Sequence, residues 1–393
     1  MPTNGNDVIR GPHNGKPILA QGGDDIIYWG PGDGSTTLYG GSAGEHYNTD
    51  VYVAGNPGGD RLYITGSQGA SIRFTTTENG TATVGNKVLK FEDIERVHGS
   101  AGNDTIIGSA AKMAPAAGGT PQHGLSIYGG AGHDSIVGSN FADVIDGGSG
   151  NDTIYSGSGD DFVQSSIGND LIYGGAGNEN IRWGLGNNVA PGNDTIYGGE
   201  GSEGIGDLIN IWVMDENWKV GGRGVRVVFD SAESGFAYST MGGVNNNLRF
   251  YQFENSWTHQ GNDNVTGANA TIGSNGQGIR MNTRWGNDQL IGSTGNDTLE
   301  GGTGRDTING GKGNDLISAN TEWYNRQTHG DGDVDTLIFR AGDGHDTVLG
   351  FDVGVDRLHL GGRSYTAVEN DHGTLLRFAG GDDILLSNVF DFI

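Results

Sequence analysis

An aliphatic side chain recurs at every ninth position over much of the chain, two residues after an acidic side chain. The acidic residues of this pattern are Asp134, Asp143, Asp152, Asp161, Asp170 and Glu179 in one run, and Asp288, Asp297, Asp306 and Asp315 in another. Each unit reads as a glycine-rich turn, such as residues 301–306, followed by a very short strand in which one side chain, here Ile308, points inward. The pattern predicts many short β-strands, each burying a single aliphatic residue.

Longer and more apolar segments interrupt this rhythm, at about 35–100, 110–125, 184–191, 203–260, 268–285 and 320–334. Two of them look like copies, because Ile94-Glu95 and Phe253-Glu254 each lie eight residues before a Gly-Asn-Asp triplet. We therefore predict a duplication within one continuous roll. Its first half covers 1–200 with an insertion at about 35–100, its second half covers 201–334 with a copied insertion at about 203–260, and residues 335–393 form a C-terminal cap.

Composition excludes several classes of protein. Of 393 residues, 76 are Gly and only 34% are hydrophobic, which is unsuited to a doubly wound enzyme or a helical bundle. The formal charge of −26 disfavours nucleic acid and anionic membranes as partners and favours a cation. No apolar run approaches the roughly 18 residues of a membrane span, and residues 1–20 lack an export signal. Without Cys there are no disulfides and no thiol catalysis.

The repeated motif Gly-Gly-x-Gly-x-Asp-x-aliphatic-x resembles the hemolysin-type calcium-binding repeat of the RTX (repeats-in-toxin) family. The resemblance implies an all-β fold, a right-handed parallel β-roll with β insertions and a C-terminal β cap, in which Ca²⁺ lies between stacked turns. Calcium prefers six to eight oxygen ligands, which carboxylates and the carbonyls of glycine-rich turns supply. The implied ligands are Asp7, Asp25, Asp104, Asp134, Asp143, Asp152, Asp161, Asp170, Asp194, Asp263, Asp288, Asp297, Asp306, Asp315, Asp335 and Asp346. The alternative for each is an ordinary turn aspartate that accepts backbone hydrogen bonds.

The C-terminal stretch carries more apolar strand-like runs at 335–339, 356–360 and 383–386, which would cover an open sheet edge. It also resembles the C-terminal region of RTX proteins exported by type I secretion, since it ends in the acidic and hydrophobic segment 391–393. The resemblance implies the type I secretion machinery as a partner and a secreted, extracellular protein.

Trp and Arg residues gather where the repeat is broken. In an acidic chain, an indole face and a guanidinium suit an acidic sugar, so we expect an acidic, uronate-containing polysaccharide as ligand. If the protein is an enzyme, these groups favour a polysaccharide lyase acting by β-elimination, with Tyr324 or His329 as base. The neutralising cations would be Arg326, Arg284 and Arg182, and the sugar-stacking rings Trp183, Trp257, Trp285 and Trp323.

Two other interpretations stay open. The aromatic residues can equally plug the roll or pack beneath the insertions, with Arg satisfying nearby carboxylates. The protein would then be a noncatalytic polysaccharide-binding, matrix or surface-layer component. On the enzyme side, the chain is similar to the type I-secreted exopolysaccharide glycanases of rhizobia, an analogy of organisation that does not settle function.

Overall fold

The computed structural model describes residues 2–41, 59–112, 124–185, 189–199, 206–213, 223–241, 243–319, 331–390 and 392. Regular structure in these ranges is β-strand throughout, apart from a 3₁₀ turn at Pro31–Asp33. No helix among these residues is long and apolar enough to cross a membrane. The chain divides into two compact units: unit 1 is Met1–Arg182 with Pro191–Asp207, and unit 2 is Trp183–Ala190 with Leu208–Ile393.

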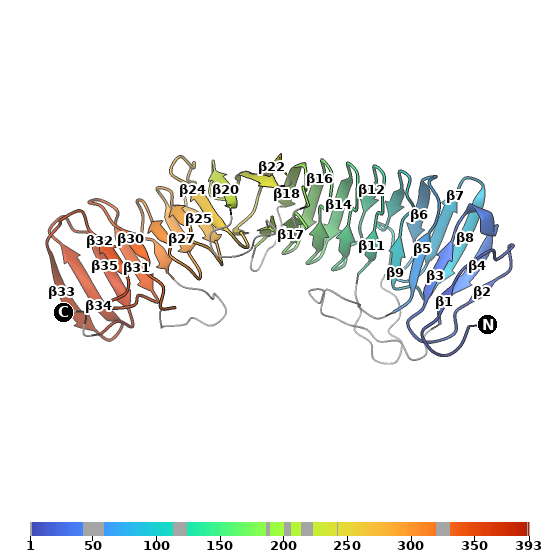
Figure 1. Ribbon diagram of the computed structural model, residues 1–393, viewed down its shortest axis with the longest axis horizontal. Helices are drawn as coiled ribbons and strands as arrows, with labels where there is room; N and C mark the ends of the chain where they lie inside the picture. The colour runs from blue at the N-terminus through green and yellow to red at the C-terminus, as the bar shows by residue number, and fades with distance from the viewer. Residues whose placement is uncertain are drawn as a thin grey trace. The chain divides into compact units, whose positions relative to one another are not determined.

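Unit 1 is a roll in which successive repeats alternate between two sheets, so that strands two repeats apart become parallel neighbours (Figure 1). Sheet A is parallel throughout, in the order β1 (Val8–Ile9), β3 (Ile26–Trp29), β5 (Arg61–Ile64), β9 (Arg96–His98), β11 (Ser126–Tyr128), β13 (Val144–Asp146), β15 (Phe162–Gln164) and β17 (Asn180–Trp183). Sheet B runs in the order β2 (Ile18–Leu19), β4 (Thr36–Tyr39), β8 (Lys87–Glu92), β7 (Gly80–Val84), β6 (Ala70–Phe74), β10 (Thr105–Ile107), β12 (Ser135–Val137), β14 (Thr153–Ser158), β16 (Leu171–Ala176) and β18 (Asn193–Gly199).

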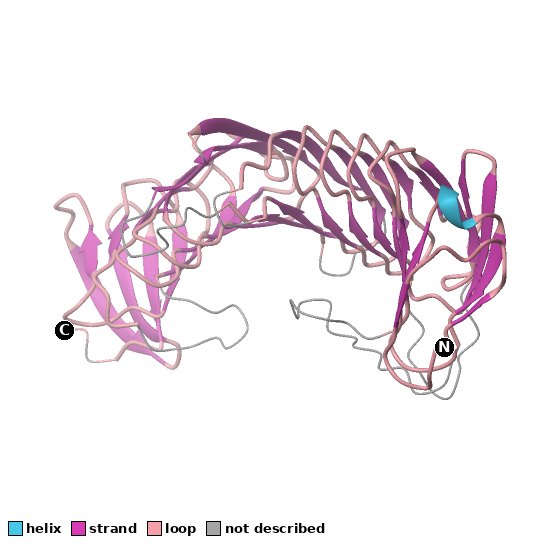
Figure 2. Cartoon of the chain, turned by 45° about the vertical axis from the view of Figure 1, so that its right-hand side comes forward, coloured by secondary structure: helices cyan, strands magenta, loops and turns pink. Residues whose placement is uncertain are grey.

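Unit 2 repeats this plan with its own strands of the two sheets (Figure 2). Its sheet A strands are β19 (Leu208–Ile211), β23 (Asn255–Trp257), β25 (Gln277–Asn282), β27 (Asn296–Glu300), β29 (Leu316–Ser318), β31 (His345–Leu349), β35 (Asp383–Ser387), β34 (Gly373–Phe378) and β33 (Tyr365–Asn370). Its sheet B strands are β22 (Val244–Tyr251), β21 (Gly235–Met241), β20 (Arg223–Phe229), β24 (Asn262–Thr266), β26 (Gln289–Ile291), β28 (Thr307–Asn309), β30 (Thr336–Ile338) and β32 (Arg357–His359).

The core of each unit is a stack of single aliphatic side chains. In unit 1, Ile154 pairs in register with Ile172, which pairs with Ile196, and all three are fully buried. In unit 2, Leu290 and Ile308 are related in the same way. Burying such a side chain stabilises the fold by roughly 1.5–3 kcal/mol. The predicted fold class is confirmed: the chain is an all-β parallel β-roll with β insertions and a C-terminal β cap.

Glycine is required where the turns of successive coils lie against each other. Gly168 has a φ of 153°, and a Cβ there would lie 1.6 Å from the carbonyl oxygen of Gly150. Only a residue without a side chain fits both the backbone conformation and this contact.

Each unit contains one antiparallel meander inserted into sheet B, β6–β8 in unit 1 and β20–β22 in unit 2. Each meander encloses an edge-to-face pair of phenylalanines, Phe74 with Phe91 at 5.6 Å and Phe229 with Phe250 at 5.5 Å between ring centroids. The two meanders therefore have the same topology. The boundaries between the halves and the cap, at residues 200 and 334, stay predictions.

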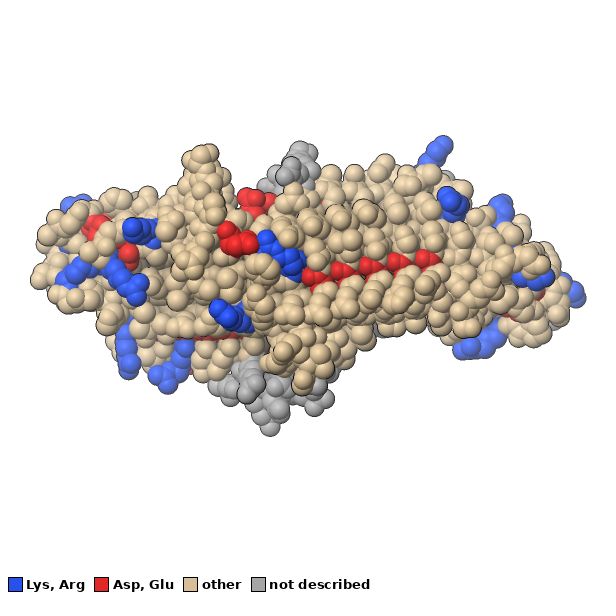
Figure 3. Space-filling view, turned by 90° about the horizontal axis from the view of Figure 1, so that it is seen from above, with Lys and Arg blue, Asp and Glu red and all other residues tan. Residues whose placement is uncertain are grey.

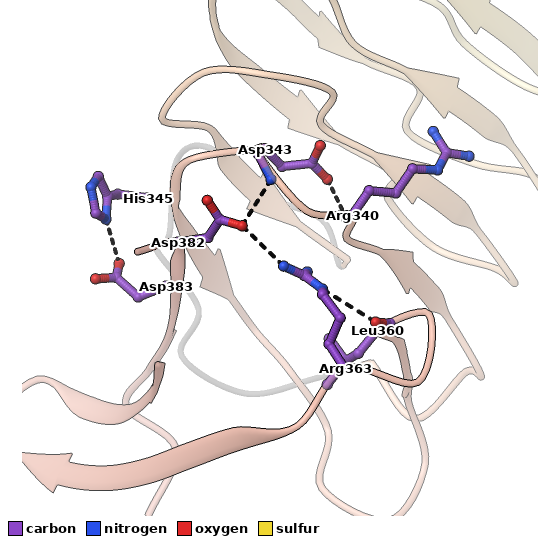
Figure 4. Close-up of polar contacts among 8 residues, drawn as sticks. Arg340, Asp343, His345, Leu360, Arg363, Asp382 and Asp383 are labelled. Atoms are coloured by element: carbon purple, nitrogen blue, oxygen red, sulfur yellow. Dashed lines mark hydrogen bonds and ion pairs between the residues drawn. The ribbon is translucent and has the colours of Figure 1, made fainter. Parts of the chain in front are cut away.

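Polar contacts hold the C-terminal strands to the last coil of unit 2 (Figure 4). The Asp382 carboxylate accepts the Gly342 backbone N–H at 2.8 Å and an Arg363 Nη1–H at 3.1 Å. The Arg363 guanidinium also lies over the ring of Phe378, 4.1 Å from its centroid. A third contact joins His345 Nδ1 to Asp383 Oδ1 at 3.0 Å. The strands β33–β35 form the C-terminal end of sheet A in this unit.

Candidate metal centres and a candidate ligand cluster

The turn aspartates form hydrogen-bonded ladders along the coils. The backbone N–H of Asp134 donates to Oδ1 of Asp152 at 2.8 Å, and the same bond links Asp152 to Asp170 and Asp170 to Asp194. In unit 2, Asp288 donates to Asp306 at 2.8 Å. Oδ1 of each carboxylate accepts the hydrogen bond of the ladder. The second oxygen, Oδ2, therefore takes no part in the ladder.

That second oxygen, Oδ2, is buried and has no hydrogen-bond partner among the described residues at six predicted ligands: Asp25, Asp134, Asp152, Asp170, Asp306 and Asp315. A buried polar atom left in this state costs on the order of 1–3 kcal/mol unless something satisfies it. Figure 3 shows a row of acidic side chains along one face of the protein surface.

Burial shifts the ionisation of these groups strongly. It raises the pKa of Asp152 to about 6 and that of Asp134 to about 7. Burial together with the neighbouring Asp194 carboxylate raises the pKa of Asp170 to about 9. Without a cation, the protein therefore holds part of each ladder protonated near neutral pH.

A glycine five residues before the aspartate leaves the space next to Oδ2. A Cβ on Gly147 would lie 2.7 Å from Oδ2 of Asp152, and one on Gly301 would lie 2.4 Å from Oδ2 of Asp306. No three acidic or histidine side chains converge in the described part of the chain. A calcium ion in these turns would therefore combine few carboxylates with backbone carbonyls, a donor set of hard oxygens that calcium accepts. The residues present fit Ca²⁺ on this account.

A second class of turn satisfies its aspartate without a cation. At Asp143, Ser139 donates its backbone N–H to Oδ2 at 2.5 Å and its hydroxyl to Oδ1 at 2.7 Å. Ser293 makes the same two bonds to Asp297, both at 2.6 Å. These serines stand where turns such as that of Asp152 have the second glycine of the motif. We call them serine-capped turns. The serine at this position before Asp170, Ser166, donates its hydroxyl to Asp146 instead.

The remaining predicted ligands have varied surroundings. Asp104 is capped by Ser100 in the same way, Asp263 accepts the Thr258 hydroxyl, and Asp7 accepts the Thr3 hydroxyl. The others accept a backbone N–H of the preceding coil through Oδ1, namely Asp161, Asp194, Asp288, Asp335 and Asp346.

Five acidic residues that the sequence did not assign as ligands continue the ladders: Asp60, Glu95, Glu179, Asp207 and Asp356. Insertions separate some of them from their partners by 35, 28 or 21 residues instead of 18. The aliphatic residue two positions later, such as Leu62 or Ile209, marks each of them in the sequence.

Two of the Trp and Arg breaks come together on unit 2. The Arg284 guanidinium carbon lies 4.3 Å from the centroid of Trp257 and 5.6 Å from that of Trp285. His259 stacks on Trp212 at 3.6 Å and meets Trp285 edge-on at 4.9 Å. Trp285 is 41% exposed, so an indole of this group is open to a ligand. We call these five residues the Arg284 cluster.

The buried carboxyl of Glu300 is linked to this cluster through Asn282. Glu300 accepts the side-chain N–H of Asn282 at 2.5 Å, and Asn282 Oδ1 accepts the backbone N–H of Arg284 at 2.9 Å. This bond helps hold Arg284 at its φ of 64°, which is unusual outside glycine. Burial raises the pKa of Glu300 to about 7.

The matching position of unit 1 also carries a carboxyl. The outward row His98, Tyr128, Asp146 in sheet A corresponds to the row Trp257, Asn282, Glu300. Burial raises the pKa of Asp146, whose Oδ1 accepts the hydroxyl of Ser166 at 2.6 Å. Each unit thus places an ionisable group of perturbed pKa on the outer side of sheet A.

The other predicted site residues do not join this cluster. Arg182 lies over the ring of Phe162 at 5.1 Å and contacts Gln164, both in unit 1. Trp183 is fully buried, so it packs in the core and offers no ring face to a sugar. Trp323, Tyr324, Arg326 and His329 lie outside the described residues.

Comparison with known proteins identifies the repeats. The family model described as RTX calcium-binding nonapeptide repeat (4 copies) matches five segments, residues 91–111, 128–163, 157–190, 191–203 and 283–317. No curated protein matches the chain. Among solved structures, the extracellular lipase LipA from Serratia marcescens is 19% identical, with a TM-score of 0.20. The match covers 67% of this chain and 39% of that one, so the chain spans about two fifths of its length.

Proposed function

Because this chain carries RTX calcium-binding nonapeptide repeats, we propose that it is a secreted protein whose roll is completed by Ca²⁺ and then binds acidic polysaccharide. RTX nonapeptide repeats bind Ca²⁺. The carboxylates with an open Oδ2, among them Asp152, Asp170 and Asp306, are the proposed ligands in this chain. Bound calcium would neutralise the buried charge that otherwise opposes folding.

The polysaccharide part rests on the Arg284 cluster. A uronate offers a planar carboxylate, which a guanidinium binds through two parallel hydrogen bonds, and an apolar ring face, which stacks on an indole. Arg284, Trp257 and the exposed Trp285 supply both groups within about one sugar ring of each other. In a chain with 48 acidic residues, a cation presented between aromatic rings is a specific anion site rather than general surface charge.

Polygalacturonate binding to the calcium-loaded protein tests this proposal. Tryptophan fluorescence follows binding at the cluster, and Arg284→Gln should weaken the affinity roughly tenfold or more, because a hydrogen bond to a charged group is lost. The matched control is Arg305→Gln, an exposed arginine of a repeat turn in the same unit. Equal affinity for Arg284→Gln and the control would refute the site.

A catalytic role is a second candidate, favoured by Glu300. A carboxyl whose pKa is about 7 is suited to accept a proton near neutral pH, as β-elimination at a uronate requires. Its hydrogen-bonded link to Arg284 connects this base to the carboxylate-binding cation. Elimination produces a conjugated double bond, seen as rising absorbance near 235 nm on a panel of uronate polymers. Glu300→Gln should abolish that rise, whereas Tyr324→Phe and His329→Gln test the bases expected from the sequence.

Export through type I machinery is the last part of the proposal. RTX repeats and the acidic, hydrophobic end of the chain support it. Fusing residues 335–393 to a reporter that lacks other signals should give reporter outside a cell that expresses a type I transporter. Reporter retained inside such cells would argue against a signal in this segment.

A further inference from the structure

The meander of unit 2 borders a cavity on its outer side that none of the preceding roles uses. Its volume is about 720 Å³, within the range of roughly 300–1,000 Å³ of small-molecule sites. It is lined by Arg226, Tyr238, Asn245, Asn247, Asn262 and Asn264, among others. The lining therefore consists largely of amides and hydroxyls, with one cation.

The register of four strands explains how these residues meet. Asn247 of β22 lies opposite Tyr238 of β21, Tyr238 lies opposite Arg226 of β20, and Arg226 lies beside Asn264 of β24. Strands are about 4.8 Å apart, so the four side chains form a continuous row. All four are exposed, and the row faces away from the core.

The charge of the cavity differs from that of the chain. No carboxylate of the described residues lines it, although the formal charge of the protein is −26. Arg226 makes no ion pair with any residue that the structure describes. An exposed guanidinium without an acidic partner among the described residues, surrounded by neutral hydrogen-bonding groups, is suited to a ligand that carries one anionic group and several hydroxyls.

The corresponding row of unit 1 has hydroxyls but no cation, no amide and no aromatic ring. There Val88 lies opposite Thr83, Thr83 opposite Ser71, and Ser71 beside Thr105. The meander therefore forms without Arg, Tyr or Asn at these positions. Their presence in unit 2 is a property of the surface and not a requirement of the fold.

We propose that this cavity is a second sugar-binding site, which takes an acidic sugar unit with its carboxylate on Arg226 and its hydroxyls on the asparagine amides. Tyr238 supplies a ring edge or face to the pyranose. The choice of an acidic glycan rests on the proposed function. The site itself lies on sheet B, whereas the Arg284 cluster belongs to sheet A of the same unit. One molecule thus offers two separate sites to acidic polysaccharide.

Calorimetry of the calcium-loaded full chain with trigalacturonic acid tests the site, with equal calcium in cell and syringe. The expected result is two binding sites per chain. Arg226→Ser, which installs the residue of unit 1, should remove one site or weaken it roughly ten- to a hundredfold. Arg73→Ser is the control, because it removes an exposed arginine from the meander of unit 1, and both sites should persist.

Arg284→Gln separates this inference from the proposed function. In that background the remaining site should still respond to Arg226→Ser, and circular dichroism should show each variant folded. Unchanged binding by Arg226→Ser overturns the second site even if Arg284→Gln is impaired. Cellotriose binding as tightly as trigalacturonic acid overturns the anionic assignment, and competition by inorganic sulfate alone at equal strength overturns the sugar assignment.

Discussion

At the scale of single residues, a serine at the second position of some repeat turns satisfies the following aspartate. Serine there, as at Ser139, donates to the carboxylate of Asp143. Glycine there, as at Gly148, leaves Oδ2 of Asp152 without a partner among the described residues. Asp143 is thus satisfied by hydrogen bonds, whereas Asp152, nine residues later, has a carboxylate oxygen that a cation could satisfy.

This difference predicts that one of two isosteric substitutions depends on calcium and the other does not. Asp152→Asn should lower stability by roughly 1–3 kcal/mol in millimolar calcium and much less in its absence, because it removes a proposed metal ligand. Asp143→Asn should cost a similar roughly 1–3 kcal/mol in both conditions, because it disrupts hydrogen bonds to Ser139. Urea unfolding with and without calcium measures both. The same calcium dependence in the two variants would remove the distinction.

At the scale of the turn, calcium binding depends on the space beside the aspartate Oδ2 as well as on the charge of the carboxylate. Gly147→Ala should weaken calcium binding, because its Cβ would meet Oδ2 of Asp152 at 2.7 Å and rotate the carboxylate away. Gly32→Ala is the control, since a Cβ there meets nothing within 4 Å. Calcium titration followed by circular dichroism compares them. A titration midpoint unchanged by Gly147→Ala would show that Oδ2 does not face the ion.

At the scale of the whole molecule, the ladders make calcium-free stability depend on pH. Burial raises the pKa of Asp134 to about 7 and of Asp306 to about 8, against an ordinary value near 4. The folded chain then binds more protons at these carboxyls than the unfolded chain, so their contribution to stability is greatest below pH 4 and is lost as pH rises through 7 to 8. Metal-stripped protein should unfold at lower urea at pH 8.5 than at pH 5. Calcium should reduce or reverse this trend, and equal midpoints without calcium would contradict it.

The sequence predicts the roll well where the repeat is strict and poorly where contacts cross insertions. The inward Ile154 and the ladder residue Asp170 follow directly from the nine-residue period. Asp60 and Asp207 were not predicted as ladder residues, because insertions place them outside the nine-residue period. The core position of Trp183 depends on tertiary packing, which the sequence pattern does not show. The row from Arg226 to Asn247 could not be foreseen, since only strand register places such residues side by side.

Each strand of the regular repeats contributes one inward aliphatic side chain, which packs on the same position of the next coil. The number of coils can therefore change without rebuilding the core. Removing residues 153–170 joins Asp152 to Leu171. Every later strand then keeps its sheet and its inward side chain, and β16 and β17 take β12 and β13 as neighbours in place of the deleted β14 and β15. We expect this shortened chain to fold with calcium and to show an unchanged β-type circular dichroism per residue. Removing nine residues instead, 153–161, sends each later strand to the opposite sheet and should abolish folding. The roll would then change length only in steps of a complete coil of two repeats.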